Sequence, residues 1–270
     1  LRHLSGVLTL TGGASNAGVI EVVQGATARY GGTATYLLDS SGQFAGGGRI
    51  EFINSAQATA ASTAPTIAES TFTVRVQDSA RFTATAPTAI ARLELADSAQ
   101  VVAQAGMQVG TLTQTGGTLT VSAASAVGQY GWAGGTLAGT GALTLLGDSS
   151  WTRGTLTGNL VIGSGATLTL STTGSDDVQG TSYKRFGTGS LSNFGTLAWQ
   201  EGHIDVVGNA RVDNHGLLDI TGNFSFGDRS VGVGTITLNN HAGALIRKNG
   251  SGETSIGSLG IPGGTANYAV

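Results

Sequence analysis

The amino-acid sequence predicts an all-β fold, a parallel β-solenoid (β-helix) in which short strands wind around one core. Three observations predict this architecture. Glycine is unusually frequent, with 45 of 270 residues. Apolar and polar residues alternate over short segments bounded by Gly, Asn, Asp or Ser. Sequence motifs also recur at intervals of about one short coil.

The composition favours a packed protein with little charge. Charged residues make up 11% of the chain, against about 25% in ordinary proteins. Apolar residues reach 40%, which is enough to form a core and argues against disorder. Three prolines exclude collagen-like structure. The absence of cysteine excludes disulfides, thiolate zinc sites and cysteine nucleophiles.

The strands are expected to be short and to bury alternate residues. Segments such as 7–10, 49–52 and 143–145 place apolar side chains on one face and Thr or charged side chains on the other. Helical periodicity is nearly absent. We expect the following side chains to point into the core: Leu145, Leu168, Leu170, Val206, Leu218, Ile220 and Leu238.

Internal repeats select the solenoid among all-β folds. Trp-x-x-Gly begins at Trp132, Trp151 and Trp199, and the first two of these tryptophans are separated by the length of one short coil. The Asn-x-Gly turns at Asn193 and Asn214 are separated by a similar length. A parallel coil of this length stacks like residues about 4.8 Å apart. We therefore expect ladders of apolar residues and hydrogen-bonded ladders of Asn.

The repeats predict one solenoid over 1–270, a piece of a longer chain. At about 22 residues per coil the chain would form about twelve coils. The repeats are looser in 1–130 and clearer in 131–270. Segments 54–70, 84–91 and 172–185 interrupt the alternation and are expected to be projecting loops. The sequence shows neither a signal peptide nor an apolar run of about 18 residues that would span a membrane.

Residues 131–256 resemble the repeat regions of large exported proteins of Gram-negative bacteria, both filamentous-haemagglutinin-like proteins and autotransporter passengers. The Trp-x-x-Gly-Thr-Leu and Asn-x-Gly motifs carry the resemblance, together with the segments that begin at Gly165 and Gly243. It implies a right-handed parallel β-helix at the cell surface that serves in adhesion, filaments or biofilm matrix. It implies no catalytic residues.

A catalytic site is not expected. His203, Asp205 and a serine would suggest a triad, but no serine lies in a Gly-x-Ser-x-Gly turn. Enzymes that process glycans on β-helices use outward carboxylates, and several charged residues fall in consecutive coils: Glu201, His203, Asp205, Arg211, Asp213 and Asp219. Paired carboxylates act as acid and base only at a suitable separation. The more ordinary interpretation is solvated outward charge, so we expect no enzyme, no cofactor and no catalytic residue.

Three binding patterns have ordinary structural explanations. Asp176 and Asp177 could contribute to a calcium site, but such ions need several converging oxygens, so no metal is expected. The pairs Thr118/Thr120, Thr155/Thr157, Thr167/Thr169 and Thr235/Thr237 would suit ice binding, yet Thr is simply a favourable outward strand residue. The repeated tryptophans would suit sugar stacking, but repeated aromatic residues more often fill the core or corners.

The predicted function is structural or adhesive, that of an extracellular rod at a Gram-negative cell surface. Two alternatives stay open: a glycan lyase or hydrolase, and a passive binder of ice or carbohydrate. The expected partners are neighbouring coils of a longer chain, copies of the chain joined end to end, and host or surface glycans. The net charge is −3 and the Lys and Arg residues are scattered, so nucleic acid is not an expected partner.

Overall fold

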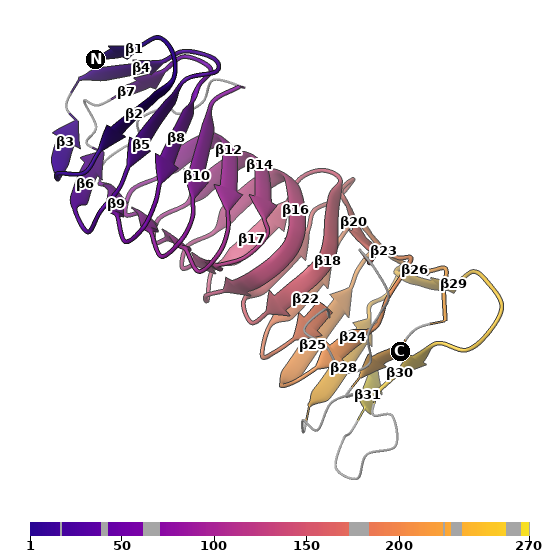
Figure 1. Ribbon diagram of the computed structural model, residues 1–270. Coiled ribbons are helices and arrows are strands. Elements are labelled where there is room, and N and C mark those ends of the chain that lie inside the picture. The colour runs from indigo at the N-terminus through magenta and orange to yellow at the C-terminus, as the bar shows by residue number, and fades with distance from the viewer. Residues whose placement is uncertain are drawn as a thin grey trace. The chain divides into compact units, whose positions relative to one another are not determined.

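A computed structural model of the chain describes residues 1–16, 18–38, 43–61, 71–172, 184–223, 225–227, 234–257 and 266–269 (Figure 1). It is an all-β parallel β-solenoid of about nine turns. The described residues contain no helix, and accordingly none that is long and apolar enough to cross a membrane. The chain divides into two compact units, Leu1–Gly128 and Gln129–Val270.

The first unit consists of three ladders of parallel strands. The first ladder is β1 (Arg2–His3), β4 (Val19–Val22) and β7 (Gln43–Ala45). The second is β2 (Val7–Leu10), β5 (Thr27–Tyr30), β8 (Arg49–Phe52), β10 (Thr73–Val76), β12 (Thr88–Leu95) and β14 (Met107–Gln114). The third is β3 (Ala14–Asn16), β6 (Thr35–Leu38), β9 (Gln57–Ala60), β11 (Arg81–Ala84), β13 (Gln100–Ala103) and β15 (Thr118–Val121).

The core of the first unit is built from columns of like residues. Ile50, Val74, Leu93 and Leu112 stack in register on four consecutive coils, and all are buried. Each step of this column, from Ile50 to Val74 and from Val74 to Leu93, advances the chain by one coil. Burial of these columns removes apolar area from water at about 25 cal/mol per Å² and stabilises the stack.

The second unit also winds as parallel ladders. One is β16 (Ser125–Ala138), β18 (Ser149–Leu156), β21 (Lys184–Phe186), β24 (Ile204–Val206), β27 (Ser225–Gly227) and β30 (Ser255–Ile256). The next is β17 (Ala142–Leu145), β19 (Asn159–Ile162), β22 (Ser190–Asn193), β25 (Asn209–Asn214), β28 (Thr235–Asn240) and β31 (Ala266–Ala269). The third is β20 (Thr167–Leu170), β23 (Thr196–Trp199), β26 (Leu217–Ile220) and β29 (Leu245–Lys248). Of these strands, β16 begins before the division between the units.

The predicted inward positions are confirmed. All seven side chains are buried: Leu145, Leu168, Leu170, Val206, Leu218, Ile220 and Leu238. The parallel pairing also confirms that the Gly- and Asn-rich turns are solenoid corners and not hairpin turns.

The repeated tryptophans lie in the core, as the sequence predicts. Trp132 and Trp151 pair in register, with ring centroids 4.5 Å apart and planes 8° from parallel. Trp199 lies further along the same column, two coils beyond Trp151. The glycine of the motif is required by packing, because a Cβ at Gly154 would lie 2.5 Å from Nε1 of Trp132.

The three predicted loops need correction. Segment 84–91 is a short corner, because β11 ends at Ala84 and β12 begins at Thr88, directly after Pro87. Within 54–70, residues Gln57–Ala60 form β9, and 62–70 lie outside the described residues. Within 172–185, Lys184 and Arg185 belong to β21, and 173–183 lie outside the described residues. Alanine and threonine obscured β9 and the start of β12, since Ala can fill an inward position without producing a strong apolar alternation.

Candidate functional site

The second ladder of the first unit presents charged residues on its outward face, which we call the arginine face. It comprises the outward Thr, Arg and Glu side chains of β5, β8, β10 and β12 that stack in two columns. Arg29, Glu51, Arg75 and Glu94 occupy the same position on consecutive coils. Because in-register stacking places neighbouring coils about 4.8 Å apart, like charges here would repel. Alternation of sign therefore stabilises the stack.

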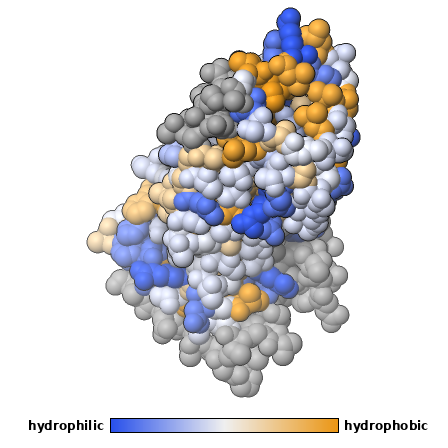
Figure 2. Space-filling view, turned by 90° about the vertical axis from the view of Figure 1, so that its left-hand side faces the viewer, coloured by the Kyte–Doolittle hydropathy of each residue, from blue (hydrophilic) through white to orange (hydrophobic). Residues whose placement is uncertain are grey.

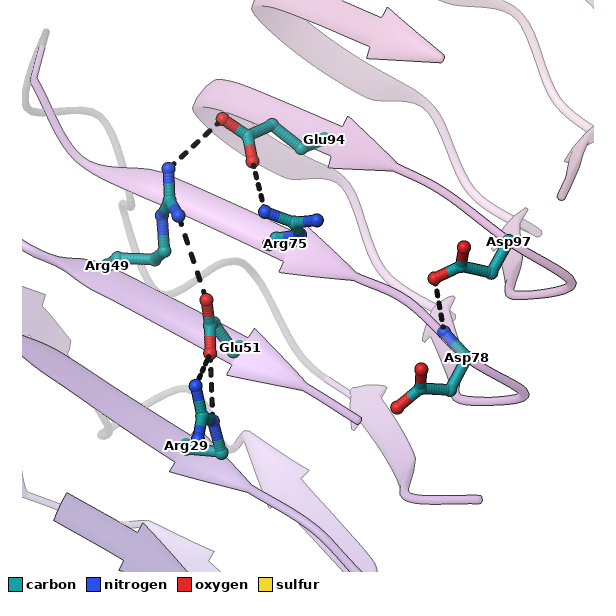
Figure 3. A network of polar contacts seen from close by, with 7 residues as sticks. All are labelled: Arg29, Arg49, Glu51, Arg75, Asp78, Glu94 and Asp97. Atoms are coloured by element: carbon teal, nitrogen blue, oxygen red, sulfur yellow. Dashed lines mark hydrogen bonds and ion pairs between the residues drawn. The ribbon is translucent and has the colours of Figure 1, made fainter. Parts of the chain in front are cut away.

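These side chains form one connected network (Figure 3). Arg29 Nη2 lies 2.8 Å from Oε2 of Glu51, and its Nε donates to the same oxygen at 2.9 Å. Arg49 reaches Glu51 at 3.7 Å and Glu94 at 3.3 Å. Arg75 Nη1 lies 3.8 Å from Oε2 of Glu94. Of these five side chains only Glu51 is buried, with 6% of its surface exposed. Its ion pairs are therefore the least screened by solvent.

A second outward column on the same strands adds positive charge. Thr27, Arg49, Thr73, Arg92 and Thr111 stack in register along it. Arg92 is exposed and has no ion pair among the described residues. The arginine face thus holds Arg29, Arg49, Arg75 and Arg92 against two glutamates, a surplus of two positive charges.

The adjoining corner has a structural role. Asn54, Asp78 and Asp97 have left-handed φ angles of 58°, 59° and 55°, a conformation that Asn and Asp tolerate better than most residues. The carboxylate of Asp78 accepts the backbone N–H of Asn54 at 2.9 Å. The carboxylate of Asp97 accepts the N–H of Asp78 at 3.1 Å (Figure 3). The repeated Asp-Ser-Ala turn of the sequence is therefore a ladder of corner caps.

In the second unit, the candidate carboxylates are distributed over three faces. Asp205, Asp213 and Asp219 lie on β24, β25 and β26, which belong to three different ladders. Each is paired with an arginine: Asp205 with Arg185 at 3.6 Å, Asp213 with Arg211 at 2.6 Å, and Asp219 with Arg247 at 2.7 Å. Of the six residues considered from sequence, the structure thus joins Arg211 and Asp213 in one ion pair.

Glu201 and His203 contact neighbouring coils. Glu201 Oε2 accepts the backbone N–H and the hydroxyl of Thr172, both at 3.2 Å. Nδ1 of His203 accepts the backbone N–H of Ser225 at 3.0 Å and lies 3.0 Å from its hydroxyl oxygen. Since Nδ1 is an acceptor, the neutral imidazole carries its proton on Nε2. Ser225 is buried, which fits a contact that holds two coils in register.

The carboxylate of Asp213 lies among several hydrogen-bond donors. Burial alone would raise its pKa, but hydrogen bonds from Arg211, Asn239 and His241 outweigh burial and lower the pKa to about 2. The Asn239 amide donates at 2.7 Å and His241 Nε2 lies at 3.3 Å. The carboxylate is therefore ionised at neutral pH and stabilises the stack of β25 and β28.

The predicted asparagine ladder is confirmed. Asn193 Nδ2 donates to Oδ1 of Asn214 at 2.8 Å, and Asn214 Nδ2 donates to Oδ1 of Asn240 at 2.7 Å. Asn193 and Asn214 have no exposed surface. The ladder continues the inward column of Leu145 and Ile162. Its side-chain amides therefore lie inside the core, where they form hydrogen bonds with one another.

A column of rings lies immediately outside this ladder. Phe194 and His215 stack with centroids 4.6 Å apart, and His215 and His241 stack at 3.9 Å. These residues directly follow the three asparagines, so the same register that pairs the amides also stacks the rings. Phe194 and His215 are exposed, and His241 is partly exposed.

The other candidate patterns do not assemble into sites. Asp176 and Asp177 lie outside the described residues. In the described part of the chain no three His, Asp or Glu side chains gather as a metal site would require. The four Thr-x-Thr pairs occupy different strands and do not stack on one another: Thr118 pairs with Gln100, Thr155 with Thr136 and Arg185, Thr167 with Thr196, and Thr235 with Asn209.

The first unit also contains a cavity of about 260 Å³. Leu10, Asn16, Ile20, Tyr30 and Tyr36 contribute to its lining. Burial, followed by repulsion from Tyr36, raises the pKa of Tyr30 to about 12, so its hydroxyl stays protonated.

Comparison with known proteins found no match among family models, curated proteins or solved structures. The geometry therefore stands alone as the basis for a functional proposal.

Sequence reasoning missed the arginine face because it treated the arginines as scattered. The signal was present as spacing, because Arg29, Glu51, Arg75 and Glu94 follow one another at intervals of one coil length. Arg29, Glu51 and Arg75 are each the third residue of a four-residue strand, so aligning these strands would have placed the three charges in one column. Glu94 lies in the longer strand β12 and continues that column on the next coil.

Proposed function

We propose that this chain is a structural and adhesive segment of a protein displayed outside the cell. The observation that carries the proposal is the in-register parallel stacking of coils whose outward side chains are mostly Thr, Arg, Glu and Asp. Such an architecture lengthens by adding coils and presents a long, repetitive surface. These properties suit reach and multivalent contact more than a single concave catalytic pocket.

The finer features of the proposal come from the repeats. We infer a right-handed coil, as the resemblance implies, and about twelve repeats of coil length. The Trp-x-x-Gly and Asn-x-Gly motifs support a place among large exported β-helical proteins of Gram-negative bacteria. They also support a role in filaments or biofilm matrix.

The expected partners include other coils of the same kind. Figure 2 shows apolar surface at its upper end, where the first strands of the first unit lie. The large apolar residues exposed on and beside these strands include Leu1, Leu4, Val7 and Val19. An apolar patch beside open strand edges favours packing against another coil, from a longer chain or a second copy.

Adhesion and location can be tested separately. Beads coated with the purified chain should attach to surfaces coated with bacterial or host glycans and should aggregate with one another, whereas beads coated with the heat-unfolded chain should not. An antibody against the chain should stain intact cells that produce it. Staining that requires permeabilised cells would contradict an extracellular location, and beads that attach to nothing would contradict adhesion.

Carbohydrate binding is a second candidate, favoured by the arginine face. Its outward arginines and threonines offer donors and hydroxyls along several coils. The third candidate, a glycan lyase or hydrolase, has weaker support because Asp205, Asp213 and Asp219 each pair with an arginine and lie on different ladders.

A further inference from the structure

We propose that the arginine face of the first unit binds an acidic polysaccharide whose sugars carry carboxylates, a polyuronate. This inference names a ligand for the adhesive function proposed above, and it rests on that function.

The charge on the face is positive although the chain as a whole is negative. Four of the six arginines in the first unit lie on this face, against Glu51 and Glu94. The two nearby aspartates, Asp78 and Asp97, lie beyond the strand ends and accept backbone N–H groups of the corner (Figure 3). On the far side of that corner lies a further arginine, Arg81.

The ion pairs leave donors available. Arg49 and Arg75 approach Glu94 at 3.3 and 3.8 Å, longer than the 2.7–2.9 Å of a strong charge-assisted hydrogen bond. Arg92 is exposed and has no ion pair in the described part of the chain. A planar guanidinium with free N–H groups binds a carboxylate through two parallel hydrogen bonds. The face can therefore hold carboxylates without losing its internal pairs.

The arrangement fits a polymer better than a small anion. Free donors recur on coils spaced about 4.8 Å apart, so a chain with one carboxylate per unit can engage several of them together. Arg92 stacks over Thr111 and Glu94 over Thr113, whose hydroxyls both donate and accept hydrogen bonds, as sugar hydroxyls require.

Other anionic partners fit less well. The interleaved glutamates would repel a nucleic-acid backbone, in which phosphates follow one another without interruption. The side chains that β5, β8, β10 and β12 contribute to the two outward columns are all Thr, Arg or Glu, so the columns hold no apolar side chain that could enter a lipid surface.

The test uses the full chain and oligogalacturonates of defined length, with fully methyl-esterified oligomers as a neutral control. Binding to the free acid should be measurable by calorimetry, should weaken as salt is raised, and should be absent for the ester. Equal binding of the ester would overturn the proposal, because it would show that the carboxylates are not recognised. Binding to duplex DNA as tight as to the oligogalacturonate would overturn it as well.

Three matched variants locate the site. Arg92→Gln should weaken binding roughly two- to five-fold, the effect of one exposed charge pair. Arg153→Gln changes the net charge equally but lies in the second unit, and should have no effect. Glu94→Gln should strengthen binding, because it frees Arg49 and Arg75. Unchanged binding in Arg92→Gln, or weaker binding in Glu94→Gln at an unchanged melting temperature, would overturn the proposal.

Failure of this inference is distinguishable from failure of the proposed function. If the coated beads attach to surfaces while the oligogalacturonate does not bind, the chain is adhesive and the ligand named here is wrong. If the beads attach to nothing and no oligosaccharide binds, the adhesive function itself fails.

Discussion

Replacement of Asn214 by alanine should destabilise the second unit substantially, although Asn214 carries no charge. Asn214 accepts a hydrogen bond from Asn193 at 2.8 Å, and donates to Asn240 at 2.7 Å and to the backbone carbonyl of Leu245 at 3.2 Å. A hydrogen bond contributes about 1 kcal/mol net, so three removed together amount to about 3 kcal/mol. The loss should lower the melting temperature by roughly 6–12 °C.

The assay is thermal and urea unfolding followed by circular dichroism. Asn209→Ala is the matched control, because Asn209 is exposed and, among the described residues, its side chain accepts one hydrogen bond, from Thr235 at 2.8 Å; it should cost less than about 1 kcal/mol. If Asn214→Ala and Asn209→Ala are equally stable, the ladder contributes no stability and the reasoning is refuted.

Four further results are expected. Ile220→Asp should unfold several coils, because Ile220 is 3% exposed and an unpaired buried charge costs several kcal/mol; a parent-like melting curve would show that the inward register is wrong. Asp213 has a folded pKa of about 2, below its unfolded value near 3.8. Its contribution to stability, at most about 2 kcal/mol after solvent screening, is therefore complete above the unfolded pKa and is lost as the pH falls toward the folded pKa. Asp213→Asn should remove part of the loss of stability in acid, and identical acid-unfolding curves of the two proteins would contradict this. No turnover of polysaccharides is expected, and activity that disappears in Asp205→Asn or Asp219→Asn would reverse this conclusion. Val7→Asp should suppress self-association, and sedimentation that shows the same oligomers in both proteins would argue against the apolar patch as the contact.

Much of the fold could be predicted from the sequence because a solenoid repeats its local rules. Alternation at Leu168 and Leu170 gives the inward positions directly, and both residues are buried. The coil-length interval between Asn193 and Asn214 indicated the pairing that their hydrogen bond shows. The tryptophan motif likewise indicated a core column, with Trp132 paired to Trp151.

Other features could not be predicted because their signal is not local. β9 (Gln57–Ala60) reads Gln-Ala-Thr-Ala, in which the inward alanines are too small to produce a clear apolar alternation. Lys184 is buried beside Phe186 in β21, where a charged residue argues against an inward position. Its ammonium donates to the backbone carbonyl of Ser171 at 2.8 Å, a partner that sequence inspection does not suggest.

In-register parallel stacking explains both the asparagine ladder and the arginine face. The stacking places equivalent residues of successive coils in contact, so a polar column must satisfy its own groups along the coil axis. An amide does so with copies of itself, because it carries both donors and an acceptor, and the buried column can repeat Asn at Asn193, Asn214 and Asn240. A charge cannot pair with a copy of itself, so the outward column must alternate in sign, as Arg29, Glu51, Arg75 and Glu94 do. In the neighbouring column arginine alternates with threonine instead of glutamate, and Arg92 has no ion pair among the described residues, so its charge remains on the surface. That unpaired charge is the part of the arginine face that the fold does not require and that a ligand can engage.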